Sequence, residues 1–207
     1  MFAPRSGRYL GPVAVVLLLF AAATAVRWVV VWAGLLVVLI LAGLLVFLAV
    51  FFRDPDRPIG PGIVSAADGR VRAVEVVDGR LVVSVFMNVT NVHVNRAPID
   101  GRLASTEVAG AGHRAAYRPD AGENVRRHYR LTTALGPVEV VQITGVLARR
   151  LVPFVGPGRI LEKGERFGMI ILGSRVDVFL PADRVVPTVR VGERVRAGTT
   201  RIAVEAA

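Results

Sequence analysis

Residues 70–86 read RVRAVEVVDGRLVVSVF and set the architecture that we expect for most of the chain. Two runs rich in β-branched residues, Arg70–Val77 and Arg80–Phe86, are separated only by Asp78-Gly79. Asp-Gly tolerates the positive φ angles of a two-residue hairpin turn, so these residues predict two antiparallel strands. Similar runs separated by turn residues continue toward the C-terminus.

Four further runs are strand-like: Val125–Thr133, Val138–Ile143, Met169–Leu172 and Val176–Leu180. Within residues 53–207, only Gly145–Val152 has a pattern that favours a helix. Most of the 21 glycines and 12 prolines lie outside the apolar N-terminal segment, which is typical of short strands joined by turns. We therefore expect a mainly β protein, with a compact domain of β-sandwich or barrel-like form over residues 53–207.

The C-terminal tail adds a second indication of β-structure. Val189–Gly198 resembles the strand-turn pattern of biotinyl and lipoyl carrier domains, in which a lysine on a hairpin carries the cofactor. Lys163 is the only lysine of this chain and lies far from the tail in sequence. The resemblance therefore predicts a biotinyl-like closure of the fold and no carrier function.

The N-terminal segment is long and apolar. From Tyr9 to Phe52 the only charged side chain is Arg27. A bilayer core takes about 20 apolar residues as helix, so the segment is long enough to cross twice and too long for a cleavable secretory signal. We expect residues 1–52 to form a membrane anchor. A transmembrane helical hairpin, Leu10–Val26 and Val29–Phe52 turning at Arg27-Trp28, is favoured over a single tilted helix.

Arginines flank this anchor on both sides, with Arg5 and Arg8 before it and Arg53 and Arg57 after it. Because basic residues stay on the cytoplasmic side, a hairpin would place both ends and the β-domain there, at the cell membrane. Of the formal charge of +10, the first 52 residues carry +3 and residues 53–207 carry +7. This charge could attract anionic lipid or reflect an arginine-rich composition, and both interpretations remain open.

The composition also excludes several classes of site. Cysteine is absent, so disulfides and thiolate metal sites are excluded, and no metal site is expected. No zinc spacing, recognition helix or interleaving of basic and aromatic residues points to nucleic acid.

Three segments interrupt strand-like sequence with polar, ionisable residues: 63–71, 86–98 and 163–181. They supply an acid, an imidazole and a hydroxyl in Asp68, His93 and Ser174. Together these groups would suit an activated nucleophile, with a base oriented by a carboxylate. Sequence spacing alone does not bring them together in space.

The same three segments, in this order, resemble the signature blocks of the phosphatidylserine decarboxylase family. Phe51–Arg57 and Gln142–Arg150 resemble further blocks of that family. The resemblance covers about residues 51–184 and is strongest to the short bacterial and archaeal branch, which includes archaetidylserine decarboxylases. One position departs from it, because Thr90 stands where some members carry a second histidine.

The resemblance implies a self-processing enzyme. Gly173-Ser174 matches the family's cleavage pair, at which Ser174 would attack the Gly173 carbonyl and become a covalent pyruvoyl group, the pyruvate cofactor. His93 would act as base and Asp68 would orient it. The products would be a large chain, 1–173, and a small chain, 174–207, which stay associated.

The implied activity is decarboxylation of a serine phospholipid, phosphatidylserine or archaetidylserine, to the ethanolamine phospholipid and CO2. The pyruvoyl carbonyl would replace pyridoxal phosphate as electron sink, since Lys163 lies in a turn-like segment without a phosphate-binding glycine loop. Two alternatives remain. One is a membrane-tethered serine peptidase that uses the same three residues, and the other is a non-catalytic membrane adaptor.

Overall fold

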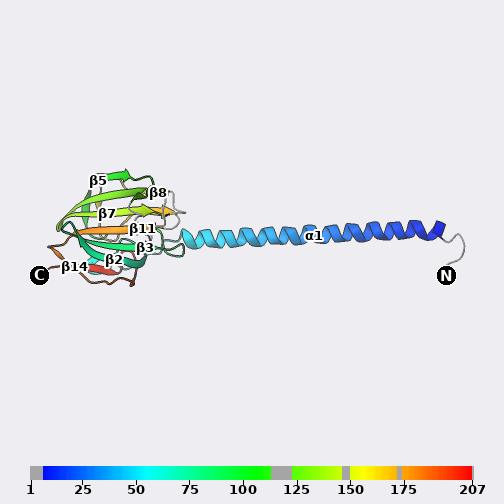
Figure 1. Cartoon of the computed structure of the whole chain (residues 1–207), viewed down its shortest axis with the longest axis horizontal. Coiled ribbons are helices and arrows are strands. Elements are labelled where there is room, and N and C mark those ends of the chain that lie inside the picture. Colours follow the sequence, from blue (N-terminus) through cyan, green and yellow to red (C-terminus); the bar gives the residue numbers. More distant parts are fainter. Residues whose placement is uncertain (1–6, 113–122, 146–149, 172–173, 207) are drawn as a thin grey trace. The chain divides into compact units, whose positions relative to one another are not determined.

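The computed structural model describes residues 7–112, 123–145, 150–171 and 174–206. These residues divide into two compact units, Met1–Ala49 and Val50–Ala207. The first consists of most of one long helix, and the second holds all of the β-strands (Figure 1).

The helix α1 runs without a break from Gly7 to Phe51, over 45 residues. The hairpin that we expected is therefore wrong, because Arg27 and Trp28 lie inside this helix. Neither glycine nor proline occurs between Pro12 and Gly34, so nothing in the sequence forces a turn there. Within the described residues, Ala14–Phe51 is the one helical segment long and apolar enough to cross a membrane.

The described part of the second unit contains fourteen strands. Their bounds are β1 Ile63–Val64, β2 Gly69–Val77, β3 Arg80–Met87, β4 Val94–Arg96, β5 Gly101–Ala109, β6 Arg126–Thr133, β7 Gly136–Thr144, β8 Arg150–Pro153, β9 Ile160–Leu161, β10 Arg166–Ile171, β11 Ser174–Pro181, β12 Val185–Pro187, β13 Arg194–Val195 and β14 Arg201–Glu205.

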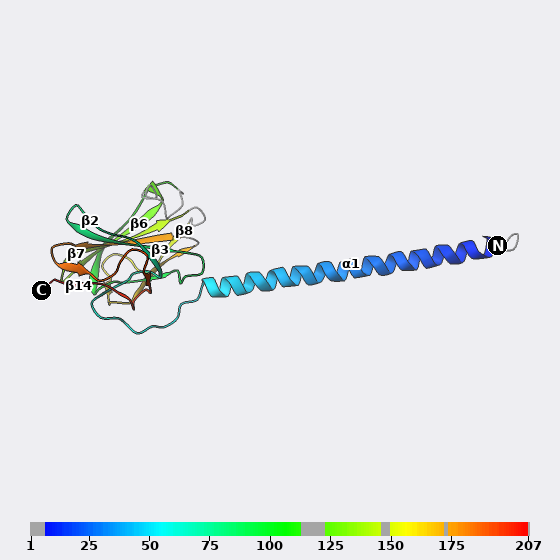
Figure 2. The ribbon, with the colours of Figure 1, turned by 60° about the horizontal axis from the view of Figure 1, so that its bottom comes forward.

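Three antiparallel sheets are built from these strands. The largest has eight strands in the order β13-β2-β3-β11-β7-β6-β5-β9 and curls into a half-barrel (Figures 1 and 2). The two smaller sheets have the orders β1-β14-β12 and β4-β10-β8. The mainly β fold is thus confirmed; β13, inside the predicted tail, pairs with β2, and β14, which follows the tail, pairs with both β1 and β12.

The β2–β3 hairpin turns where the sequence predicted. Val77 pairs with Arg80 across it, and the two residues between them have positive φ angles, 49° at Asp78 and 73° at Gly79. Strands β6, β7, β10 and β11 likewise cover the four other predicted runs, apart from residues at the ends of the runs and Leu172, which lies outside the described residues.

Strand β11 lies at the centre of the large sheet, between β3 and β7. Its inward side chains Val176, Val178 and Leu180 are buried in the main hydrophobic cluster, which also includes Val83 and Val140. Full burial of one such side chain contributes about 1.5–3 kcal/mol, so this strand is held firmly in register. The register sets its first residue, Ser174, between β3 and β7.

The helix expected over Gly145–Val152 is a second correction. Arg150–Pro153 forms strand β8, while residues 146–149 lie outside the described residues. Leu151 and Val152 pair with Ile170 and Met169 of β10, and this cross-strand pairing outweighs the weak local helical preference.

Candidate active site

Asp68 lies just before β2, in a buried loop. Its Oδ1 accepts from the Ala197 backbone N–H at 2.8 Å and from Nη1 of Arg57, and its Oδ2 accepts from Nη2 of Arg57 at 2.9 Å. This two-pronged pair raises the pKa of Arg57, chiefly through the hydrogen bond to Asp68. Gly69 fixes the local backbone, because a Cβ there would overlap the Phe86 carbonyl of β3.

His93 is fully buried just before β4. Its Nδ1 lies 2.9 Å from the Asn91 carbonyl oxygen, which can only accept, so Nδ1 carries the proton. In the neutral ring, Nε2 then holds the free lone pair. Nε2 is buried and has no hydrogen-bond partner among the described residues.

The surroundings of His93 favour its neutral form. Burial lowers the pKa of this imidazole most, and the positive charge of Arg53 lowers it further. The hydrogen bond to Asn91 and the negative charge of Asp68 act in the opposite direction and do not outweigh these effects. The Phe51 ring packs against the imidazole with ring centroids 4.3 Å apart. A buried, neutral histidine with a free Nε2 is suited to accept a proton.

The backbone brings His93 to the strand that leads to Ser174. The His93 carbonyl accepts from the N–H of Ile170 at 3.2 Å, four residues before Ser174 in sequence. Ser174 itself is paired through its Cα position with Met87 of β3 and Thr144 of β7. Gly173, the other half of the predicted cleavage pair, lies outside the described residues.

Asp68 reaches the same end of the sheet through β2. One row across β2, β3 and β11 is formed by Arg70, Phe86 and Arg175. Asp68 lies two residues before Arg70, and Ser174 lies one residue before Arg175, so both are at the same end of these strands. No hydrogen bond from His93 to Asp68, by which the carboxylate could orient the ring, occurs among the described residues. In this structure the Asn91 carbonyl orients His93, and Asp68 pairs with Arg57.

Thr90, at the position of the second family histidine, belongs to a tight polar loop. Its backbone N–H and hydroxyl both donate to Oδ1 of Asn88, each at 2.7 Å. Its carbonyl accepts from Nη2 of Arg53 at 2.6 Å. Thr90 thus supports the loop that carries Asn91, and it ties that loop to the residues following α1.

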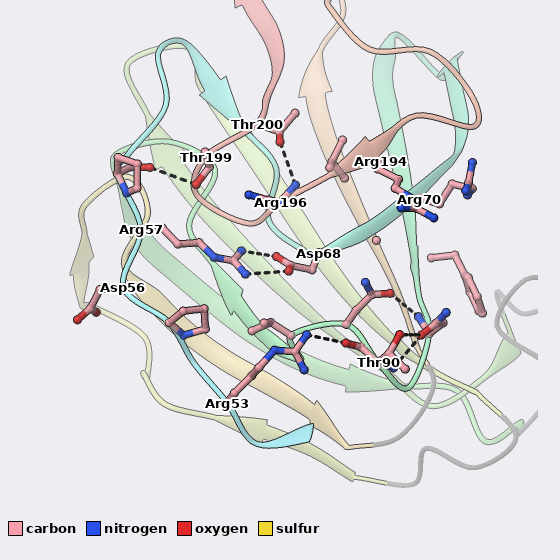
Figure 3. A pocket seen from close by; sticks show the side chains of 18 of the residues that line it. Arg53, Asp56, Arg57, Asp68, Arg70, Thr90, Arg194, Arg196, Thr199 and Thr200 are labelled. Atoms are coloured by element: carbon pink, nitrogen blue, oxygen red, sulfur yellow. Dashed lines mark hydrogen bonds and ion pairs between the residues drawn. The ribbon is translucent and has the colours of Figure 1, made fainter. Parts of the chain in front are cut away.

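A cavity of about 1260 Å³ opens beside this loop (Figure 3). Asp68, Asn91 and Val92 line its wall nearest the candidate site. We call it the arginine-lined cavity, because six arginines surround it: Arg53, Arg57, Arg70, Arg72, Arg194 and Arg196. Among the described residues, only Arg57 of these six has a carboxylate partner.

Sequence reasoning missed this cavity. Arg53 and Arg57 served there only as markers of membrane topology, and the remaining charge was treated as diffuse. A signal was present, because two pairs of arginines recur two residues apart, namely Arg70 and Arg72 on β2, and Arg194 of β13 with Arg196 just after that strand. That spacing in a strand directs side chains to one face of the sheet.

Comparison with known proteins gives a consistent family. A family model described as phosphatidylserine decarboxylase matches residues 44–203. A phosphatidylserine decarboxylase proenzyme from Thermobifida fusca is 48% identical over 157 residues, covering 75% of this chain and 72% of that protein. One from Streptomyces coelicolor is 46% identical over 154 residues, covering 73% and 70%. A provisionally named archaetidylserine decarboxylase proenzyme from Halobacterium salinarum is 47% identical over 161 residues, covering 76% and 80%.

Proposed function

The chain belongs to the phosphatidylserine decarboxylase family, and on this premise we propose that it decarboxylates a serine phospholipid to the ethanolamine phospholipid and CO2. We further propose that it first cuts itself between Gly173 and Ser174 and converts Ser174 to a pyruvoyl group. The word proenzyme in the names of its relatives supports such processing.

In the cutting step, the Ser174 hydroxyl attacks the Gly173 carbonyl while His93 Nε2 accepts the hydroxyl proton. The amide nitrogen of Ser174 is the leaving group and takes up a proton, so an ester replaces the peptide bond. Elimination then releases Gly173 as a carboxylate. One water hydrolyses the remaining imine, which releases ammonia and leaves the keto group at residue 174.

The observation that carries this proposal is the state of His93. The imidazole is buried, its proton is fixed on Nδ1 by Asn91, its Nε2 is unpaired, and the His93 backbone bonds to the strand that precedes Ser174. Leaving a buried polar atom without a partner costs about 1–3 kcal/mol, and such a cost is understandable at a reacting group.

The contacts of Asp68 support a role other than orienting His93 directly. Its charge raises the pKa of His93, so it favours the imidazolium that forms when Nε2 takes the proton. We propose that it acts through this charge and through its hold on Arg57, without a direct hydrogen bond to the ring. Asp68→Asn should therefore slow the cutting less than His93→Ala.

The pyruvoyl group, once formed, would supply an electron sink for the pair that stays on the substrate carbon when CO2 leaves. His93 can afterwards return a proton to the carbon that has lost CO2. Ser174 at the start of β11 keeps the reacting group attached to a buried strand of the small chain, so the two chains should stay associated after cutting.

Intact-mass measurement tests the processing step. The purified protein should give two masses, for residues 1–173 and for residues 174–207 with a pyruvoyl-blocked N-terminus. Ser174→Ala should give one uncut, inactive chain. A serine peptidase would retain an intact Ser174 and hydrolyse other proteins, and an adaptor would show no mass change. An active wild-type preparation with one full-length mass would refute the self-processing proposal.

The long apolar helix suggests association with a membrane. We propose that α1 anchors the enzyme and that the β-domain, with its charge of +7, lies on the cytoplasmic side. At about 1.5 Å per residue, its 45 residues span about 68 Å, roughly twice the 30 Å of a bilayer core. Protease protection of tags at both termini in oriented vesicles tests this, and a protected C-terminal tag in inside-out vesicles would contradict the cytoplasmic assignment.

A further inference from the structure

The arginine-lined cavity holds more positive charge than the structure neutralises. Arg57 is paired with Asp68, but Arg70, Arg194 and Arg196 are exposed and pair with no carboxylate among the described residues. The Arg70 guanidinium donates a hydrogen bond to the Gly192 carbonyl oxygen, which carries no charge to neutralise it. Figure 3 shows Arg70, Arg194 and Arg196 along the same rim of the cavity.

The sheet register also places two of these unneutralised arginines directly opposite each other. Arg194 of β13 and Arg70 of β2 are direct cross-strand partners. Like charges at directly opposed positions of an antiparallel pair are destabilising, and proteins normally avoid them. Two arginines held in this way at the rim of a hollow suggest that an anion completes the arrangement.

The cavity also adjoins the candidate active site. Asp68 and Asn91 line it, and the carbonyl of Asn91 is the one that orients His93. A molecule in the cavity would therefore contact both Asp68 and Asn91, next to the candidate active site, and the unpaired arginines of the rim.

The covalent chain places this cavity close to the end of the apolar helix. Arg53 and Arg57 are in its wall, and they follow the last residue of α1, Phe51, by two and six residues. At about 3.5 Å per residue at most, Arg53 lies within roughly 7 Å of the helix end. Because the proposed anchor would tether the cavity to a bilayer, a ligand from the membrane is favoured over one from bulk solution.

We propose that the arginine-lined cavity binds the phosphodiester of an anionic phospholipid head group, with Arg70, Arg194 and Arg196 as its phosphate contacts. This inference rests on the proposed function and identifies where the substrate's non-reacting part is held. Guanidinium groups suit this task, because their planar forks donate two parallel hydrogen bonds to phosphate oxygens. Phosphate binding here would hold the serine end of the head group toward Asp68 and Asn91.

Phosphatidylglycerol is the probe that separates binding from turnover, because its head group has the phosphodiester but no amine or carboxylate. The full chain is placed in micelles of a non-ionic detergent that contain phosphatidylglycerol or, in parallel, phosphatidylcholine. Thermal unfolding of the β-domain is followed by circular dichroism. Phosphatidylglycerol should raise the midpoint by about 3–6 °C, and phosphatidylcholine should raise it less.

Two matched triple variants test the residues. Arg70→Gln, Arg194→Gln and Arg196→Gln together should abolish most of that rise. The control combines Arg102→Gln, Arg190→Gln and Arg201→Gln, which removes the same charge from exposed arginines outside the cavity and should keep the rise. Equal losses in both variants would show diffuse attraction to the whole domain and would overturn the proposal.

Inorganic phosphate tests whether the cavity binds a free anion and not a lipid head group. At matched phosphate concentration it should raise the midpoint less than phosphatidylglycerol does. An equal or larger rise would assign the cavity to free anions and would overturn the lipid assignment.

Turnover is measured separately on phosphatidylserine in the same micelles. The cavity variant should cut itself as fully as the wild type and show a KM raised about tenfold or more, with a smaller change in kcat. If the wild type binds phosphatidylglycerol through the cavity but does not decarboxylate phosphatidylserine, the proposed function fails while the lipid site stands. A wild type that decarboxylates without any effect of the cavity arginines would leave the function standing and remove the site.

Discussion

Two groups of arginines on the β-domain differ in what neutralises them. Arg96 and Arg166 pair with carboxylates of the segment that follows α1, and Asp54 accepts from both. Asp56 pairs with Arg166 at 2.8 Å. Arg70 and Arg194, in contrast, face each other across two strands without a carboxylate among the described residues. The first group makes structural ion pairs, while the second group lacks the counter-charge that a ligand would bring.

The paired group explains how the cavity wall is formed. Buried Arg96, with its side chain 6% exposed, also donates to the carbonyls of Pro55 and Gly164. It thereby fastens residues 54–56 to β4 and to the turn before β10. Figure 2 shows this segment running along the side of the β-domain. Because Arg53 and Arg57 flank the fastened residues, the paired arginines hold the cavity wall in place.

Removing Arg96 should have the largest effect on stability. Arg96→Met keeps much of the side-chain volume but leaves Asp54 with one partner fewer and two carbonyls without a donor. Loss of one member of a buried ion pair costs about 3 kcal/mol or more, so the free energy of unfolding should fall by about that amount. Urea unfolding of the full chain in detergent measures it. Arg102→Met, at an exposed position, should change it by less than about 0.5 kcal/mol.

Much of the β-fold could be predicted from local sequence. Asp78-Gly79 is a residue pair that tolerates positive φ, and the turn forms there. The segments that form β3, β7 and β11 are rich in β-branched residues, which favour strands. The hairpin at Arg27 was wrong because its only evidence was helix length and one charge. Strand β8 was missed because it exists through pairing with β10, a contact distant in sequence.

A second effect on stability, smaller than that of Arg96→Met, should come from His93, which is buried without any charged hydrogen-bond partner. Its pKa in the folded chain lies below the ordinary 6.5, so the unfolded chain binds more protons between the two values. The stability from neutral His93 is therefore complete above about pH 6.5 and is lost as the pH falls toward the lowered pKa. In that window the free energy of unfolding should rise with pH, with a slope no steeper than about 1.4 kcal/mol per pH unit.

The measurement compares Ser174→Ala with Ser174→Ala/His93→Gln, so that both chains remain uncut. The difference between their unfolding free energies should be constant above about pH 6.5 and should shrink below it. His128 is present in both proteins and its contribution cancels. A difference that stays flat down to pH 5 would show that His93 is not held neutral by its burial.

The site was predicted less completely than the fold. Ser174 and His93 could be named as candidates because their surroundings match family segments, and the backbone bond from Ile170 to His93 links the second of these residues to β10. The partner of Asp68 could not be predicted, since Arg57 reaches it from the segment after α1 through side-chain geometry alone. The facing of Arg70 and Arg194 depends on the pairing of β13 with β2, and nothing local in sequence fixes that register.

The smallest effect should have the opposite sign from that of Arg96→Met. Arg194→Gln removes one of two facing like charges, so in low salt without anionic lipid it should stabilise the β-domain by about 0.5 kcal/mol. Arg194→Glu should stabilise it further, because it creates an opposite-charge pair with Arg70. Arg190→Gln, an exposed change outside the cavity, should have no measurable effect. Added salt weakens interactions between exposed charges, and a bound phosphodiester neutralises the arginines directly, so either addition should reduce both gains. If Arg194→Gln instead destabilises the protein whether or not anionic lipid is present, the cross-strand arginines contribute to the fold as the paired group does, and the contrast between the two groups is lost.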